Sequence, residues 1–183
     1  MDRNEAISMM KRHVKKDFLI KHMLATEAIM RALARELGKD EELWGMTGLV
    51  HDVDFEECKS DWSDHGIISQ DLLKGKLPEE GLRAILAHNY EKTGVQPETE
   101  LDWALLAADA ITGLIVAAAL VKPDKKLASV TVDSVKNAFK KKGFAAGSNR
   151  EHIMKCGEFG LEPAKFFEIS LKAMQAISDD LGL

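Results

Sequence analysis

The longest apolar stretch of the chain, residues 104–121, contains a single charged residue, Asp109. A membrane-spanning helix needs about 20 apolar residues, and an aspartate at its centre would be costly there. The same composition is typical of a helix buried in a protein core, where the carboxylate needs a partner that compensates its burial. We therefore expect a long core helix over 100–120, capped by Thr99, and a positively charged partner for Asp109.

The spacing of apolar residues predicts helices along the whole chain. Apolar residues recur at intervals of three and four, whereas the alternating β-branched pattern of strands is scarce. The remaining helices are expected at 4–14, 18–37, 41–53, from His65, from Pro78 to His88, at 131–142 and from Pro163. A chain of 183 residues has the length of one ordinary domain. The predicted fold is an all-α, single-domain helical bundle over 1–183, which the helices from about 131 complete.

Histidines and aspartates follow one another in the order H…HD…H…H…D. They are His22, His51, Asp52, His65, His88 and Asp109. Adjacent residues on a helix point about 100° apart, so His51 and Asp52 can share one cation only near a helix end, where the backbone relaxes. Imidazole and carboxylate donors without thiolate suit Zn, Fe, Mn, Ni or Co and leave positions for water and substrate. The pattern therefore predicts a catalytic metal site.

This ordered pattern resembles the HD-domain superfamily of metal-dependent phosphohydrolases. The resemblance lies in the blocks LVHDVDFE (49–56), DHGIIS (64–69), RAILAHN (83–89), LLAADAITGLIVAAALVKP (105–123) and KKKGFAAGSNRE (140–151). It implies a helical bundle of the HD-domain type, with metal ligation by His22, His51, Asp52 and Asp109. It also implies that His65 and His88 complete a second metal site, as in the binuclear branches. No Gly-Tyr-Pro signature follows a second HD-like element, so the cyclic-dinucleotide phosphodiesterase branch is not supported.

The activity that this resemblance implies is hydrolysis of a small phosphoester, with nucleotides among the candidates. One or two divalent ions (Mn, Fe, Ni, Co or Zn) would polarise a phosphoryl oxygen and lower the pKa of bound water to about 7. We assign Asp52 to the catalytic residues. Asp54 follows the HD pair directly, where a carboxylate either orients a ligand histidine or takes the proton of the water.

Three further residues are candidate substrate contacts. Thr112 follows Asp109 by about one helical turn, so it either borders a substrate cavity or packs in the core. Lys142 ends a basic run at 140–142, and Arg150 lies in the first turn of a helix that begins at Ser148-Asn149. Basic side chains beside glycines and a helix N-terminus can hold a phosphate.

Two other functions fit the same residues. Di-iron oxygenases that resemble myo-inositol oxygenase share the ligand order, but they bind O₂ and oxidise a C–H bond. A non-catalytic ligand-binding module would use the metal only for structure. Iron content and colour would separate an oxygenase from a hydrolase, because hydrolases often accept Mn, Co, Ni or Zn.

Charge and cysteine content limit the partners and the compartment. Lys and Arg total 25 against 30 Asp and Glu, so general nucleic-acid binding has no electrostatic support. Cys58 and Cys156 lack C-x-x-C spacing, and the first residues lack the apolar segment of a signal peptide. We expect a cytoplasmic protein with a small phosphorylated partner and no membrane contact. The helix from Pro163 would pack either against the domain or against a second copy in a homodimer.

Overall fold

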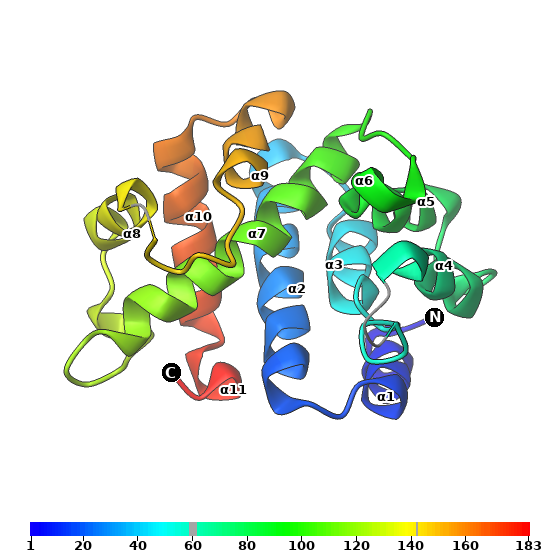
Figure 1. Ribbon diagram of the computed structural model, residues 1–183, viewed down its shortest axis with the longest axis horizontal. Helices are drawn as coiled ribbons and strands as arrows, with labels where there is room; N and C mark the ends of the chain where they lie inside the picture. Colours follow the sequence, from blue (N-terminus) through cyan, green and yellow to red (C-terminus); the bar gives the residue numbers. More distant parts are fainter. Residues whose placement is uncertain (59–61, 142) are drawn as a thin grey trace.

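The protein is described here by a computed structural model that covers residues 1–58, 62–141 and 143–183. Within these residues the chain forms eleven α-helices and no strand, which confirms the all-α prediction (Figure 1). The α-helices are α1 (Arg3–His13), α2 (Asp17–Leu37), α3 (Glu41–Val50), α4 (Ile67–Leu73), α5 (Glu79–His88), α6 (Tyr90–Thr93), α7 (Glu100–Leu120), α8 (Val132–Lys140), α9 (Arg150–Met154), α10 (Pro163–Ala176) and α11 (Ser178–Leu181). Short 3₁₀ helices lie at η1 (Trp62–Asp64), η2 (Leu127–Ser129) and η3 (Lys155–Phe159).

Two long helices, α2 and α7, organise the bundle. Figure 1 shows α7 running obliquely across the middle of the molecule, with α3 to α6 on one side and α8 and α10 on the other. Helix α2 packs against α3, α7 and α10, and α7 contacts α5, α8, α9 and η3 as well. His22 and Asp109 lie on these two helices, His88 lies on α5, which packs against α7, and the His51-Asp52 pair follows α3, which packs against α2.

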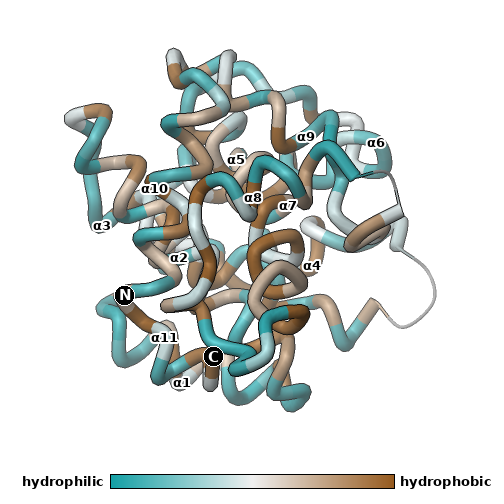
Figure 2. Tube along the Cα trace, turned by 90° about the vertical axis from the view of Figure 1, so that its left-hand side faces the viewer, coloured by the Kyte–Doolittle hydropathy of each residue, from teal (hydrophilic) through white to brown (hydrophobic). Residues whose placement is uncertain are grey.

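Helix α7 is the predicted core helix, with the bounds expected from the sequence. Its length and composition would allow it to cross a membrane, but 61% of its most apolar 18-residue window is buried inside the protein. Figure 2 shows apolar segments around α7 in the interior and hydrophilic segments towards the outside. Thr99 caps it by accepting a hydrogen bond from the Asp102 backbone N–H, as the sequence predicts.

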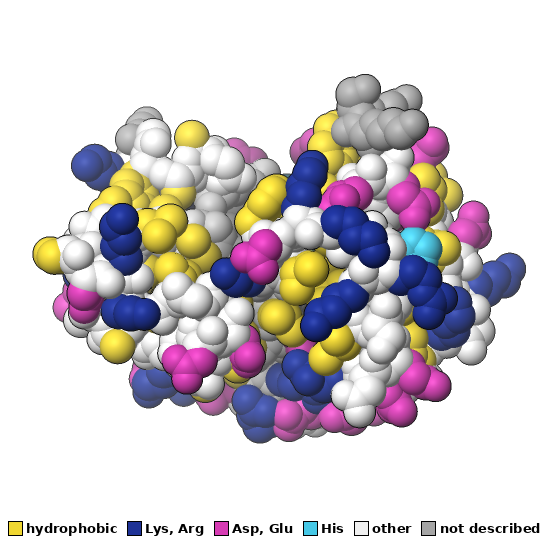
Figure 3. Space-filling view, turned by 90° about the horizontal axis from the view of Figure 1, so that it is seen from below, with side chains coloured by type: hydrophobic (Ala, Val, Ile, Leu, Met, Phe, Trp, Pro, Cys, Tyr) yellow, Lys and Arg dark blue, Asp and Glu magenta, His cyan; other side chains and the backbone are white. Residues whose placement is uncertain are grey.

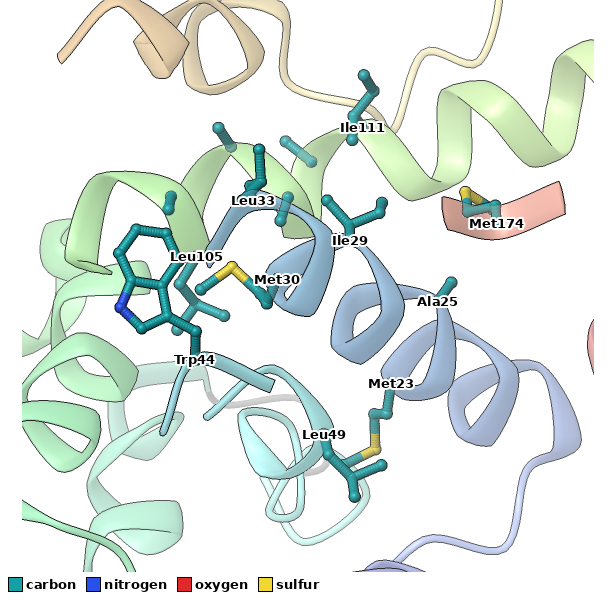
Figure 4. Packing of buried hydrophobic residues seen from close by; sticks show 14 of the residues in the cluster. Met23, Ala25, Ile29, Met30, Leu33, Trp44, Leu49, Leu105, Ile111 and Met174 are labelled. Atoms are coloured by element: carbon teal, nitrogen blue, oxygen red, sulfur yellow. The ribbon is translucent and has the colours of Figure 1, made fainter. Parts of the chain in front are cut away.

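The core fills both sides of α2. Figure 4 shows Met30 and Met23 pointing towards Trp44 and Leu49 of α3, while Ile29 points towards α7. All five side chains are buried. Close packing of α2 on α3 explains a helix-breaking residue in α3: a Cβ on Gly48 would lie 2.9 Å from Met30 Cγ and 3.0 Å from the Thr26 carbonyl oxygen. Side chains larger than hydrogen at this position would force the helices apart.

Helix α10 begins at Pro163, as predicted. It packs against α2, α7 and α8 of the same chain, which is the first of the two alternatives that its apolar face allowed. Homodimerisation stays a prediction. On the face seen in Figure 3, acidic and basic side chains are interspersed with apolar ones, so no charge of one sign dominates that face.

Candidate metal centre

The His51-Asp52 pair lies just beyond the end of α3. The sequence placed that helix end near Val53, but α3 ends at Val50 and the chain continues in turns, with Val53 N–H at 3.4 Å from the Val50 carbonyl oxygen. The relaxed backbone lets both side chains reach one centre. His51 Nε2 lies 3.3 Å from Asp52 Oδ1.

Two residues from the long helices approach this pair. His22 Nε2 on α2 lies 3.3 Å from His51 Nε2 and 3.6 Å from Asp52 Oδ2. Asp109 on α7 brings Oδ1 to 3.0 Å from His22 Nε2 and 3.8 Å from His51 Nε2. The structure therefore brings together all four side chains that the sequence assigned to the first metal.

A second group forms on the other side of Asp52. Asp52 Oδ1 lies 3.4 Å from His65 Nε2 and 3.5 Å from His88 Nε2, and the two histidine nitrogens are 3.0 Å apart. His65 follows η1, and His88 ends α5. Asp52 thus belongs to two groups of potential ligand atoms, each group lying within 4.8 Å: one with His22 and His51, the other with His65 and His88.

The outer nitrogen of each histidine has a hydrogen-bond partner that fixes the ring. His51 Nδ1 lies 2.8 Å from the Gly48 carbonyl oxygen, His65 Nδ1 lies 2.8 Å from Asp54 Oδ1, and His88 Nδ1 contacts the Ile85 carbonyl oxygen. These oxygens can only accept, so each Nδ1 carries the proton. Each Nε2 of a neutral ring then points a lone pair into the cluster.

Thr112 fixes the fourth ring. The Thr112 hydroxyl donates its one proton to the Asp109 carbonyl oxygen at 2.8 Å. The same hydroxyl oxygen lies 2.9 Å from His22 Nδ1. The Thr112 oxygen therefore accepts from His22 Nδ1, and His22 Nε2 also presents a lone pair. Thr112 is buried and holds a cluster histidine in place, and it also lines a second cavity beside the cluster. Its position is compatible with both of its predicted roles.

These residues fit a cation. Neutral Nε2 atoms only 3.0 Å and 3.3 Å apart cannot hydrogen-bond to each other, since neither has a proton to give. A cation between them would accept both lone pairs, and the Asp52 and Asp109 carboxylates would supply negative charge. The nitrogen and oxygen donors match those of borderline divalent metals. The buried cluster is compatible with metal binding.

Without a cation, protons must hold the cluster together. Burial alone would lower the pKa of His51, but Asp52 and Asp109 outweigh it and raise that pKa to about 9. Burial likewise opposes protonation of His65, yet hydrogen bonds to Asp52 and Asp54 raise its pKa to about 10. Burial would raise the pKa of Asp52, but the charge of His51 and hydrogen bonds from His65 and His88 hold it well below its usual range. The site thus stabilises positive charge.

Asp54 requires a correction to its predicted proton-accepting role. It is fully buried. Its Oδ1 accepts from His65 Nδ1, and its Oδ2 accepts from the backbone N–H groups of Gly66 at 2.7 Å and Ser69 at 3.0 Å. A carboxylate with both oxygens occupied, and outside the cavity wall, cannot reach a substrate water. The geometry matches the other predicted role, that of orienting a ligand histidine.

Arg150 also requires a correction, because it does not face the cluster. Its guanidinium donates hydrogen bonds to backbone carbonyl oxygens of the preceding segment, those of Ala138, Phe144, Ala145 and Ser148. Both of its terminal nitrogens are thus used in holding the chain's own backbone, and the structure gives no support to the predicted phosphate contact. Lys142, the other basic candidate, lies outside the described residues.

A cavity of about 360 Å³ opens over the cluster. His51 is fully buried and does not line this cavity, while the side chains of His22 and Asp109, which line it, are 20% and 31% exposed. Besides cluster residues, it is lined by Leu19, Phe55, Asn89 and His152. The sequence analysis missed His152, although it is one of only six histidines and lies two residues after Arg150. Asn149 places it by capping α9 through the N–H groups of Glu151 and His152.

Comparison with known families agrees with this geometry. The family model described as HD domain matches residues 19–114, which include every histidine and aspartate of the cluster. The chain has no match among curated proteins and none among solved structures. HD-domain proteins are mostly metal-dependent hydrolases with an all-α fold. Since the match covers more than half of the residues, the chain belongs to the HD-domain family.

Proposed function

We propose that the protein is a metal-dependent phosphohydrolase that cleaves a small phosphoester. The observation that carries this proposal is the shared carboxylate: Asp52 belongs to both groups of potential ligands at the floor of one cavity. Paired divalent metals held about 3.5–4 Å apart are a recurring feature of phosphatases. His22, His51, Asp52 and Asp109 would hold the first ion, and His65 and His88 would hold the second with Asp52.

The bound ions would supply Lewis acidity and a water of lowered pKa at the cavity floor. The chain's own groups define the rest of the reaction. The water oxygen forms a bond to phosphorus, the ester P–O bond breaks, and the alcohol oxygen leaves with a proton. The Asp52 and Asp109 carboxylates face the cavity, where they would hold the ions, and the proton that the water gives up ends on the departing alcohol. Leu19 and Phe55 add apolar surface to the cavity wall.

A metal analysis followed by a substrate panel tests this function. Protein purified without added metal is analysed for Mn, Fe, Co, Ni and Zn, and then assayed for phosphate release from phosphomonoesters with each ion added. We expect hydrolysis with at least one ion other than iron. Strict dependence on iron with O₂ consumption, and no phosphate release, would instead identify the oxygenase chemistry.

Thr112→Val should weaken metal binding without leaving a cavity in the hydrophobic core. Valine has nearly the shape of threonine but cannot accept the proton of His22 Nδ1, so the ring loses the contact that aims Nε2 at the cluster. Loss of such an outer partner typically costs about 10–100-fold in metal affinity. Competition with a chelator measures the change. Thr112→Ser is the matched control and should bind as the wild type does; equal affinities of all three proteins would contradict this role.

The metal-free protein should lose stability as the pH rises. The pKa values of His51 and His65 are raised from 6.5 to about 9 and about 10 in the folded chain. Groups with a raised pKa stabilise the fold fully below pH 6.5, and that stabilisation disappears as the pH approaches their folded values. We expect the melting temperature to fall by roughly 5 °C from pH 6.5 to pH 9.5. Calorimetry of chelator-treated protein measures it.

The metal-loaded protein is the control for this experiment. Its histidines would already be neutral when they bind a cation, so its melting temperature should change less over the same range. A flat profile for the metal-free protein would show that the cluster is not held by protonated histidines.

A further inference from the structure

A second cavity continues from the one above the cluster. Its volume is about 400 Å³, and it shares His22, Asp109 and His152 with the first cavity. From this junction it runs as a trough along α7, whose residues Ala110, Gly113 and Ala117 form one wall, with residues 145–149 opposite. The three α7 positions are spaced by three and four, so they share one helical face. A ligand bound in the cavity above the cluster could therefore extend into this trough.

Both walls of the trough consist mainly of small residues, and the walls approach each other closely at Gly113. A Cβ on Gly113 would lie 3.0 Å from Ser148 Oγ, which is tighter than ordinary van der Waals contact. Among the residues that the structure describes, the aromatic rings that line the trough are the imidazoles of His22 and His152, both at the junction with the first cavity. A flat purine therefore has no ring to stack on along most of its length.

The wall opposite α7 is preformed. Ala145 has φ +47°, a left-handed conformation that side chains with a Cβ disfavour. Arg150 holds this segment by donating to the carbonyl oxygens of Ala145 and Ser148, at 2.7 Å and 2.8 Å. A backbone held against its preference beside a cavity is a frequent feature of ligand sites. Arg150 thus shapes this wall.

Two polar side chains in the trough have no hydrogen-bond partner for their side-chain atoms within the described part of the chain. Ser148 is only 8% exposed, and His152 at the junction is partly buried. The Ser148 hydroxyl can both donate and accept a hydrogen bond, and each imidazole nitrogen of a neutral His152 can do one or the other. A ligand with hydroxyl groups would satisfy both.

Charge limits the ligand further. No lysine or arginine lines either cavity among the described residues. Metal ions could balance the phosphate being cleaved, but a second anionic group in the trough would be buried without a partner.

We propose that the trough binds the alcohol half of a phosphomonoester, and that this half is slim, hydroxylated and uncharged, with His152 beside the ester oxygen and Ser148 further along. The inference rests on the proposed phosphohydrolase function and narrows its substrates. It favours acyclic polyol phosphates over nucleotides and bisphosphates.

Matched substrates test the charge requirement. Glycerol 3-phosphate and 3-phosphoglycerate have similar shapes, but only the second carries a carboxylate on the alcohol half. The metal-loaded wild-type protein should show kcat/KM at least about tenfold higher for glycerol 3-phosphate than for 3-phosphoglycerate or AMP. Equal or reversed preference would overturn the proposal. A wild type that hydrolyses no phosphomonoester with any metal would refute the proposed function itself, and this inference with it.

Two variants test the location. Gly113→Val fills the trough and should lower kcat/KM for glycerol 3-phosphate by at least about tenfold. Ser148→Ala removes the hydroxyl without adding bulk and should lower it by about fivefold, mainly through KM. Inorganic phosphate binding, measured by calorimetry on the metal-loaded protein, should stay unchanged in both, as should metal content. Val116→Ile, which adds a methylene to α7 outside the trough, is the control.

These readouts separate the outcomes. A loss of kcat/KM with unchanged phosphate binding places the alcohol half in the trough. Both variants within twofold of the wild type in kcat/KM, while the wild type hydrolyses glycerol 3-phosphate, would leave the proposed function standing and reject the trough as its alcohol site. Parallel loss of phosphate binding and metal in both variants would reject it also, because the substitutions would then act on the cluster.

Discussion

Asp52→Ala is expected to remove bound metal and activity together. The Asp52 carboxylate lies between the two histidine groups, within 3.3–3.6 Å of the Nε2 atoms of His51, His65, His88 and His22. Removing it deletes the anionic ligand common to both proposed ions and leaves converging imidazoles poorly balanced against dications. Metal affinity should fall by more than about 100-fold, beyond the usual cost of losing an outer partner.

Turnover of Asp52→Ala should fall by at least about 10³, because several kcal/mol of charge stabilisation disappear with the metal. Elemental analysis after gel filtration and phosphate-release kinetics measure the two effects. Asp71→Ala is the control, since Asp71 is an exposed aspartate on α4. Full metal occupancy in Asp52→Ala would show that Asp52 is not a ligand.

The double variant His65→Ala/His88→Ala is expected to keep roughly one metal per chain while turnover falls by orders of magnitude. Both rings are buried, and their Nε2 atoms lie 3.0 Å apart beside Asp52 Oδ1. Their removal takes the second group away and leaves His22, His51 and Asp109 with Asp52. One remaining ion cannot assist both the attacking and the leaving oxygen, so we expect a loss of about 10²–10⁴ in kcat.

Metal stoichiometry and kcat measured on the same sample decide this prediction. His13→Ala is the matched control, because His13 lies on α1 away from the cluster. Its Nδ1 lies 2.7 Å from Oε1 of Glu57, a residue in the turns that follow α3. The control should keep both metals and full turnover. If the double variant does the same, His65 and His88 are structural and the site is mononuclear.

The sequence pattern identified the candidate ligands but not the residues that orient them. The resemblance singled out His22, His51, Asp52, His65, His88 and Asp109, and the structure brings all six side chains to one centre. The hydrogen-bond partners that orient these histidine rings could mostly not be predicted from the sequence. His22 and Thr112 are 90 residues apart in the chain yet hydrogen-bonded, and no local periodicity indicates such a contact.

The role of Arg150 could not be predicted from the sequence either. A basic residue near glycines and a helix start is typical of phosphate binding, and the sequence offers no reason to prefer another role. In the folded chain its guanidinium turns to backbone carbonyls at 138–148. His152, two residues later, is the side chain that reaches the cavity instead.

The sequence by itself determined the helical fold, the core helix at 100–120 with its Thr99 cap, the start of α10 at Pro163 and the identity of the candidate ligands. These depend on periodicity, capping and residue type, which act over a few neighbouring positions. Tertiary structure alone decided the end of α3 at Val50, the burial of Asp54 behind His65 and the trough beside α7. Each of these arises where distant segments pack together, because contact between them selects which side chains face the cavity and which are used to hold others in place.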